Sequence, residues 1–301
     1  MNKNFILLII LLLIIILGCF SINNKSKTIA KENIISFIGE DERLFKPSLE
    51  KNIDLNLNAK IASSTLLTND QKIILYENNL EEKTAIASIT KLMSAVIVID
   101  NYPSNSKILI DEKMLSAWGT SGSLKLGEHI TIENLLYIML IESSNDAAEC
   151  LASKLDRENF IILMNEKAKK LKMKKTFFVN PSGLDEDDGT YNTSSAKDLT
   201  ILASEIIKNY PLIPEILSHK EYTVKSEEGV DHKITTTNSL LREMPIGTWG
   251  KTGYTEIANG CLILMTKNDL GDIIINIIIN SNDRFREMKN LTTWINNSFS
   301  F

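Results

Sequence analysis

Hydrophobic positions divide the chain into an apolar N-terminal run, a long polar stretch and a region of regular patterns. Residues 5–17 are all hydrophobic, whereas residues 19–57 are rich in Asn, Lys, Ser and Glu and keep no sustained period. We expect a signal peptide or membrane anchor over residues 1–18 and a tether over residues 19–57. Regular patterns begin after the tether and predict a folded domain over residues 58–301.

Strand patterns occur at both ends of this domain, and helical patterns lie between them. Runs rich in β-branched and other apolar residues occur at 60–67, 72–76, 261–266 and 272–280. Apolar residues recur at helical spacing over the segments 89–99, 133–142, 146–155, 160–171, 284–296 and the segment that follows Ser195. We predict an α/β fold in which the first hairpin joins the final strands in one antiparallel sheet. Helices flank this sheet, and a helical subdomain is inserted between its two parts.

The composition is that of a globular protein with a small negative charge. Of 301 residues, 44% are hydrophobic and 24% are charged, and the net charge of −5 argues against a nucleic-acid partner. The three histidines lie far apart and none stands at ligand spacing from a cysteine, so we expect no metal and no cofactor. Cys150 falls in a helical run and Cys261 in a strand, and we expect two buried thiols rather than a disulfide.

The end of the apolar run resembles a bacterial lipoprotein signal. Its last residues, Ile16 and Leu17, are followed by Gly18 and Cys19. In such a signal the cysteine becomes the lipidated N-terminus after cleavage. An uncleaved anchor is the alternative, although the run is shorter than the roughly 20 residues of a comfortable span. Either alternative predicts an exported chain that is held at a membrane and faces the periplasm or cell wall.

Ser88 and Lys91 place a hydroxyl and an amine at the start of a strongly apolar helix. Residues three apart lie on one helical face, so the two side chains can meet. An amine can deprotonate a hydroxyl only when part of it is neutral, which requires desolvation or a neighbouring positive charge. The pair is weak evidence on its own, because Ser88 could cap the helix and Lys91 could reach out to solvent.

Two further motifs follow in order, Ser143-Ser144-Asn145 and Lys251-Thr252-Gly253. The ordered set S-x-x-K, S-x-N and K-T-G is typical of active-site serine enzymes that recognise penicillin. The chain resembles the low-molecular-mass D-alanyl-D-alanine carboxypeptidases, the penicillin-binding proteins of peptidase family S11. This resemblance covers about 58–301, and the segments that carry it are 87–93, 143–148, 180–185 and 251–255. The chain departs from the family at Ser144, where the family usually has glycine.

The resemblance implies a DD-peptidase/β-lactamase-like fold and a serine DD-carboxypeptidase. Such an enzyme removes the terminal D-alanine of peptidoglycan stem peptides through an acyl-enzyme, and β-lactam antibiotics acylate it. Ser88 is then the nucleophile and Lys91 its base, while Ser143 relays a proton to the leaving amine. Asn145 holds the peptide or Lys91, and Lys251 attracts the substrate carboxylate.

The resemblance also implies the groups that hold the substrate. The oxyanion donors are the backbone N–H groups of Ser88 and Tyr254, on the strand that carries Gly253. Thr252 hydrogen-bonds the terminal carboxylate and Arg284 binds it as a fork. Arg286 is the alternative to Arg284 in that role.

Other functions remain open at this point. A DD-endopeptidase that cleaves peptidoglycan cross-links uses the same residues, and a non-catalytic wall-binding lipoprotein could keep the fold. A class A β-lactamase is disfavoured, because no Glu-x-x-Leu-Asn motif follows Ser143. The acidic segment 185–189 lacks the alternation and distal Glu of a calcium loop, so we expect a solvated loop. Trp118 and Trp249 are expected to be packing residues.

Overall fold

The computed structural model describes residues 48–49, 55–68, 71–115 and 124–301. The predicted anchor, Cys19 and Trp118 lie outside the described residues, as does most of the predicted tether. Residues Leu49–Ser300 form one compact unit, and the account below concerns that unit. Among its described helices, none has the length and apolar character that crossing a membrane requires.

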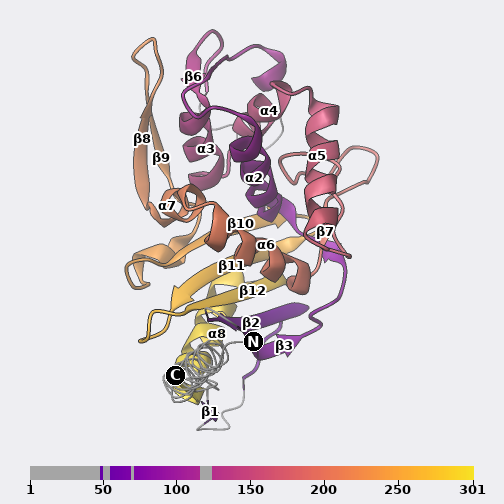
Figure 1. The fold of residues 1–301 in the computed structure, drawn as a ribbon, viewed down its shortest axis with the longest axis vertical. Coiled ribbons are helices and arrows are strands. Elements are labelled where there is room, and N and C mark those ends of the chain that lie inside the picture. The colour runs from indigo at the N-terminus through magenta and orange to yellow at the C-terminus, as the bar shows by residue number, and fades with distance from the viewer. Residues whose placement is uncertain (1–47, 50–54, 69–70, 116–123) are drawn as a thin grey trace, which may run out of the picture. The chain divides into compact units, whose positions relative to one another are not determined.

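A five-stranded antiparallel sheet forms the centre of the domain (Figure 1). Its order is β10-β11-β12-β2-β3, so the first hairpin pairs with the last strand of the C-terminal group, as the sequence predicts. The strands are β2 (Ile61–Leu67), β3 (Lys72–Asn78), β10 (Trp249–Thr255), β11 (Asn259–Lys267) and β12 (Ile273–Ser281). β2, β11 and β12 are buried along most of their length, which explains their nearly continuous apolar sequences.

The predicted helices are present, with boundaries shifted by a few residues. They are α2 (Lys91–Asn101), α3 (Ile132–Ile141), α4 (Asn145–Ser153), α5 (Arg157–Lys170), α6 (Ala196–Asn209) and α8 (Arg284–Ser298). α6 packs on β2 and β12, and α8 packs on β11 and β12. Ser195 caps α6, because its hydroxyl accepts a hydrogen bond from the backbone N–H of Asp198. The helices α2 to α5 form the predicted inserted subdomain, above the sheet in Figure 1.

Several short elements are absent from the sequence prediction. They include the helix α7 (Leu212–Ser218) and the 3₁₀ turns η1 (Ala87–Thr90), η2 (Lys113–Leu115) and η3 (Ser239–Arg242). Three pairs of short strands are β8 (Glu221–Lys225) with β9 (Asp231–Thr235), β4 (Thr84–Ala85) with β7 (Thr193–Ser194), and β5 (Lys107–Leu109) with β6 (His129–Thr131). The two-residue strands are β1 (Ser48–Leu49) and β13 (Phe299–Ser300). Of these, η1 matters most for the site, because it contains Ser88.

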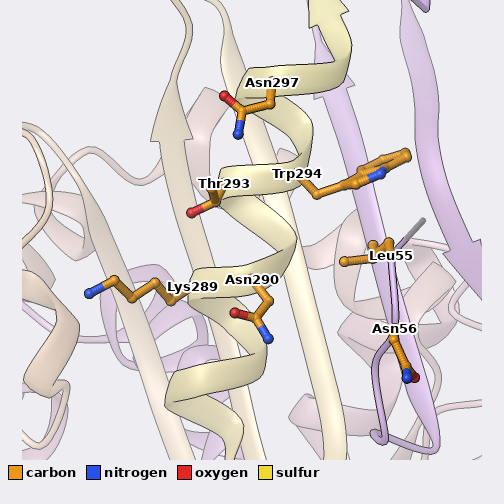
Figure 2. A pocket seen from close by; sticks show the side chains of 7 residues that line it. All are labelled: Leu55, Asn56, Lys289, Asn290, Thr293, Trp294 and Asn297. Atoms are coloured by element: carbon orange, nitrogen blue, oxygen red, sulfur yellow. The ribbon is translucent and has the colours of Figure 1, made fainter. Parts of the chain in front are cut away.

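The first described residues of the domain run beside α8. Figure 2 shows Leu55 and Asn56 next to this helix, where they line a shallow pocket with Trp294 and its neighbours. The backbone N–H of Asn58 donates to Glu287 Oε1 at 3.0 Å and fastens the segment to the helix. None of the predicted site residues lines this pocket. Cys150 and Cys261 are buried free thiols, as predicted.

The two faces of α5 predict opposite responses to truncation. Phe160 is fully buried in the core, whereas Ile162 is 53% exposed. Phe160→Ala removes many buried contacts and leaves a cavity, so it should lower the free energy of unfolding by about 3–5 kcal/mol. Ile162→Ala on the same helix is the matched control and should change it by less than about 1 kcal/mol. Denaturant unfolding followed by circular dichroism measures both, and equal losses would contradict the assigned core.

Candidate active site

Ser88 and Lys91 meet at the junction of η1 and α2. In a 3₁₀ turn residues i and i+3 lie one above the other, and Lys91 Nζ is 3.0 Å from Ser88 Oγ. α2 begins after Thr90, so Ser88 is not the residue at its N-cap position. Lys91 is fully buried and does not reach solvent. The two structural alternatives for this pair are therefore wrong.

The Lys91 amine has two further partners, and both are acceptors. Its Nζ lies 2.8 Å from Asn145 Oδ1 and 2.6 Å from the carbonyl oxygen of Ser182. Burial is the main cause that lowers the pKa of Lys91 well below its usual range. The charge of Lys251 lowers this pKa further, and the charge of Glu149 opposes the shift. A neutral amine has two N–H groups and one lone pair. The two acceptors match the N–H groups, and the lone pair is left for the hydroxyl of Ser88.

Lys251 forms a second buried pair with a serine. Its Nζ donates to Ser143 Oγ at 2.7 Å and to the carbonyl oxygen of Thr252 at 3.0 Å. Burial, followed by the charge of Arg284, lowers the pKa of Lys251 to about 7. The three sequence motifs thus converge on two serine–lysine pairs.

The second motif occupies the junction between α3 and α4. Ser143 has a positive φ of 66°, which few residues other than glycine adopt and which marks local backbone strain. Ser144 follows as the N-cap of α4, where its hydroxyl accepts from the N–H of Ala147 at 3.1 Å. The serine that replaces the family's usual glycine therefore stabilises the start of the helix that carries Asn145.

The third motif brings β10 directly against η1. A Cβ atom at Gly253 would lie 3.0 Å from the backbone nitrogen of Ser88 and 3.0 Å from the carbonyl oxygen of Ile86. A side chain here would crowd both atoms, and glycine therefore lets the two backbones approach closely beside Ser88. Thr252 is buried and shares a hydrogen bond with the hydroxyl of Thr237, whereas the side chain of Tyr254 is 62% exposed.

The structure distinguishes the two candidate arginines. Arg284 Nη1 donates to the carbonyl oxygen of Gly253 at 3.4 Å, and its Nε is buried with no hydrogen-bond partner among the described residues. Burial lowers the pKa of Arg284 from its usual value. Arg286 is exposed and pairs with Asp283 on its own helix. Arg284 therefore lies beside β10, and Arg286 faces solvent.

A buried loop outside the three motifs carries Ser182, whose carbonyl oxygen accepts from Lys91. The side chain of Asn192 donates to Thr90 Oγ1 at 3.0 Å and to the carbonyl oxygen of Asn180 at 2.9 Å. Its Oδ1 accepts from the N–H of Val179 at 2.6 Å. Asn192 therefore ties the loop that carries Ser182 to the turn that carries Lys91. The segment 180–185 was visible through the family resemblance, but Asn192 belongs to no motif and gave no signal.

Gly183 brings the same loop against η1. A Cβ atom at this position would lie 2.1 Å from the carbonyl oxygen of Ala87, and its φ is +87°. Asp185 anchors the far end of the loop, where it accepts from Thr255 Oγ1 at 3.1 Å. This part of the predicted solvated loop is therefore engaged with β10 rather than free in solvent. Trp249 is buried, as predicted for a packing residue.

Comparison with known proteins places this arrangement in one family. The family model described as D-alanyl-D-alanine carboxypeptidase, Peptidase S11, matches residues 53–283. The D-alanyl-D-alanine carboxypeptidase DacF of Bacillus subtilis is 33% identical over 214 residues, which are 68% of this chain and 54% of that protein. The D-alanyl-D-alanine endopeptidase of Pseudomonas aeruginosa is 34% identical over 230 residues, which are 70% of this chain and 69% of that protein. This chain thus spans about half the length of the Bacillus protein.

Solved structures agree with the sequence comparison. Penicillin-Binding Protein D2 of Listeria monocytogenes, solved in its ampicillin-bound form, is 33% identical with a TM-score of 0.69. The match covers 80% of this chain and 98% of that one. The matched family model, the relatives and the shared fold together show that this chain belongs to the D-alanyl-D-alanine carboxypeptidase family, peptidase family S11.

Proposed function

We propose that the protein is a serine-type D-alanyl-D-alanine carboxypeptidase that removes the terminal D-alanine from peptidoglycan stem peptides. The observation that carries the proposal is the buried amine of Lys91, which lies 3.0 Å from the hydroxyl of Ser88. Burial lowers the pKa of this amine and so favours its neutral form, and its two other contacts leave its lone pair for the serine.

Acylation follows from this geometry. Ser88 Oγ attacks the carbonyl carbon of the penultimate D-alanine while Lys91 takes the hydroxyl proton. The tetrahedral oxyanion is held by the backbone N–H groups of Ser88 and Tyr254. The C–N bond then breaks, and the departing amine receives a proton through Ser143, whose hydroxyl already contacts Lys251.

Deacylation uses water to complete the hydrolysis. Water adds to the ester carbonyl, the bond to Ser88 Oγ breaks, and the serine recovers its proton. The products are the shortened stem peptide and one free D-alanine. Asn145 keeps Lys91 in place through both steps.

Recognition of the substrate's terminal carboxylate makes the enzyme specific for the C-terminal end of the peptide. Lys251 and Thr252 are neighbours on β10, and Arg284 of α8 donates to the carbonyl oxygen of Gly253 on the same strand. An anionic terminus bound there would raise the pKa of Lys251 and keep it charged. The same site suits a β-lactam, whose carboxylate and amide resemble those of the peptide.

A DD-endopeptidase is the second candidate. Curated relatives from Pseudomonas aeruginosa and Escherichia coli bear that name at 34% and 32% identity, and about 70% of their lengths are matched. We further propose that the protein is exported and held at a membrane by residues 1–18, with Cys19 as the lipidation site. The catalytic domain would then face the periplasm or cell wall.

The first prediction concerns the nucleophile. A domain of residues 48–301 should release free D-alanine from a stem pentapeptide that ends in D-Ala-D-Ala, and Ser88→Ala should abolish this release. Ser63→Ala is the matched control, because Ser63 is a buried serine of β2 that makes no hydrogen bond among the described residues. Free D-alanine is measured with a D-amino-acid oxidase assay.

Each outcome of this assay has a distinct meaning. Undiminished release by Ser88→Ala would remove Ser88 from the mechanism. Cleavage of a cross-linked stem dimer without release from the pentapeptide would establish the endopeptidase. A folded protein that neither cleaves these substrates nor traps labelled penicillin would be a wall-binding lipoprotein instead.

The second prediction is a shift in pH dependence. Acylation by penicillin should increase with pH as Lys91 loses its proton. Lys251→Gln removes a neighbouring positive charge that lowers the pKa of Lys91. The rising limb of the plot of acylation rate against pH should therefore move to higher pH. Lys267→Gln, at an exposed lysine of β11, should leave the limb in place. An unchanged midpoint in Lys251→Gln would contradict the coupling between the two lysines.

The third prediction assigns Asn192 as a positioning residue for Lys91. Asn192→Leu keeps the approximate volume but removes every hydrogen bond that ties the 179–184 loop to Thr90. Acylation should fall by at least tenfold, and its pH midpoint should change. Asn276→Leu is the control, because Asn276 is a buried, hydrogen-bonded asparagine within the sheet. Both variants should lose stability, but only Asn192→Leu should change the pH profile of the folded fraction.

A further inference from the structure

The end of α5 and the turn that follows it carry a dense run of lysines. Five exposed lysines lie within seven positions, and none forms an ion pair with a described carboxylate: Lys169, Lys170, Lys172, Lys174 and Lys175. The whole chain has a net charge of −5. This run is therefore a local reversal of charge, which the total composition conceals.

An apolar groove borders the run. It lies between α5 and the segment 177–179, and the side chains of Ile161, Phe178 and Val179 contribute to its walls. Ile162 and Phe177 also line it and are 53% and 54% exposed. Lys169 and Glu166 stand at its rim. Exposed aromatic and aliphatic side chains beside unpaired lysines are typical of surfaces that meet a lipid headgroup layer.

The lysine run lies near the start of β2, where the N-terminal part of the chain joins the domain. Lys197 lowers the pKa of Glu81, and the charges of Lys175 and Lys174 lower it further. The next residue, Glu82, forms an ion pair with Lys60 at 2.6 Å. Phe177 also pairs with Thr193, the first residue of β7, and Figure 1 shows β7 beside the lower end of α5. A surface at this end of the domain can reach the membrane to which residues 1–18 are proposed to attach.

We propose that this surface, defined as the five lysines with Ile162 and Phe177 and called here the α5 surface, docks on an anionic phospholipid bilayer. The ammonium groups meet the phosphates of the headgroups, while Ile162 and Phe177 enter the interfacial layer. A soluble anionic wall polymer could satisfy the lysines, but it would leave the apolar groove without a partner. The combination of charge and exposed apolar side chains therefore favours a lipid surface.

Docking through the α5 surface adds to a predicted N-terminal attachment, because two weak membrane contacts on one chain strengthen each other. It also orients the domain relative to the bilayer, which a tether alone does not do. The residues of this surface lie outside the serine–lysine site, so the proposal does not depend on the proposed catalytic function.

Vesicle binding tests the proposal. The domain of residues 48–301 is sedimented with sucrose-loaded vesicles of phosphatidylglycerol and phosphatidylcholine, or of phosphatidylcholine alone. We expect binding to the anionic vesicles only, weakened by high salt. The triple variant K169Q/K174Q/K175Q should bind on the order of 100-fold more weakly. The matched control, K208Q/K233Q/K267Q, removes the same charge at exposed lysines elsewhere and should bind as wild type does.

Phe177→Ser separates the two components of the surface. It should weaken binding to anionic vesicles at least severalfold without changing the net charge. Circular dichroism and trapping of labelled penicillin confirm that each variant is folded, and failure to trap penicillin by all proteins alike would bear on the proposed function and not on docking.

Three results would overturn the docking proposal. The first is the absence of binding to anionic vesicles by the wild-type domain. The second is an equal loss in both triple variants, which would mean that only the total charge matters. The third is binding of a soluble glycerol phosphate polymer without binding of vesicles, which would assign the surface to the cell wall.

Discussion

The burial of the Lys91 amine is the constraint on which the site depends. An ammonium group without water is unfavourable, and the described residues offer it acceptors but no direct carboxylate partner. The consequence is a low pKa rather than an unpaired buried charge. A second buried lysine, Lys251, lowers the pKa of Lys91 further, and its own pKa is lowered to about 7. Burial thereby favours the neutral, proton-accepting form of both amines.

Close backbone approaches hold these groups in position. Gly183 and Gly253 let two chain segments approach η1 closely, and at Gly183 the distance excludes any side chain. Ala87 and Ser143 adopt positive φ values on either side of the site, so backbone strain is concentrated around the reacting hydroxyl. The surrounding core must supply the free energy that maintains this strain, and the apolar α2 and α3 provide much of it. The rigid fold and the poised amine are therefore parts of one arrangement.

Much of this arrangement could be predicted from the sequence because it rests on patterns. The long apolar strands and helices have clear patterns, and the order of the three motifs in the sequence identifies Ser88, Lys91 and Lys251. The hairpin of β8 and β9 and the helix α7 were not predicted, because segments of five to seven residues give too few positions to establish a period. Asn192 was also missed, since its importance comes from contacts with residues distant in sequence. The sequence predicted no basic run of useful length among its mixed charges, and the position of the lysines beside an apolar groove comes from the fold.

The most direct test of this account is to measure the ionisation of Lys91 itself. Selective ¹³C labelling of lysine side chains allows each Cε resonance to be followed by NMR as the pH changes, and Lys91→Ala identifies the resonance of interest. The account predicts that the Lys91 resonance titrates at a far lower pH than the resonances of the surface lysines. A Lys91 resonance that titrates together with the surface lysines would show that the amine is charged at neutral pH. It could then not serve as the base for Ser88, and the central claim would be wrong.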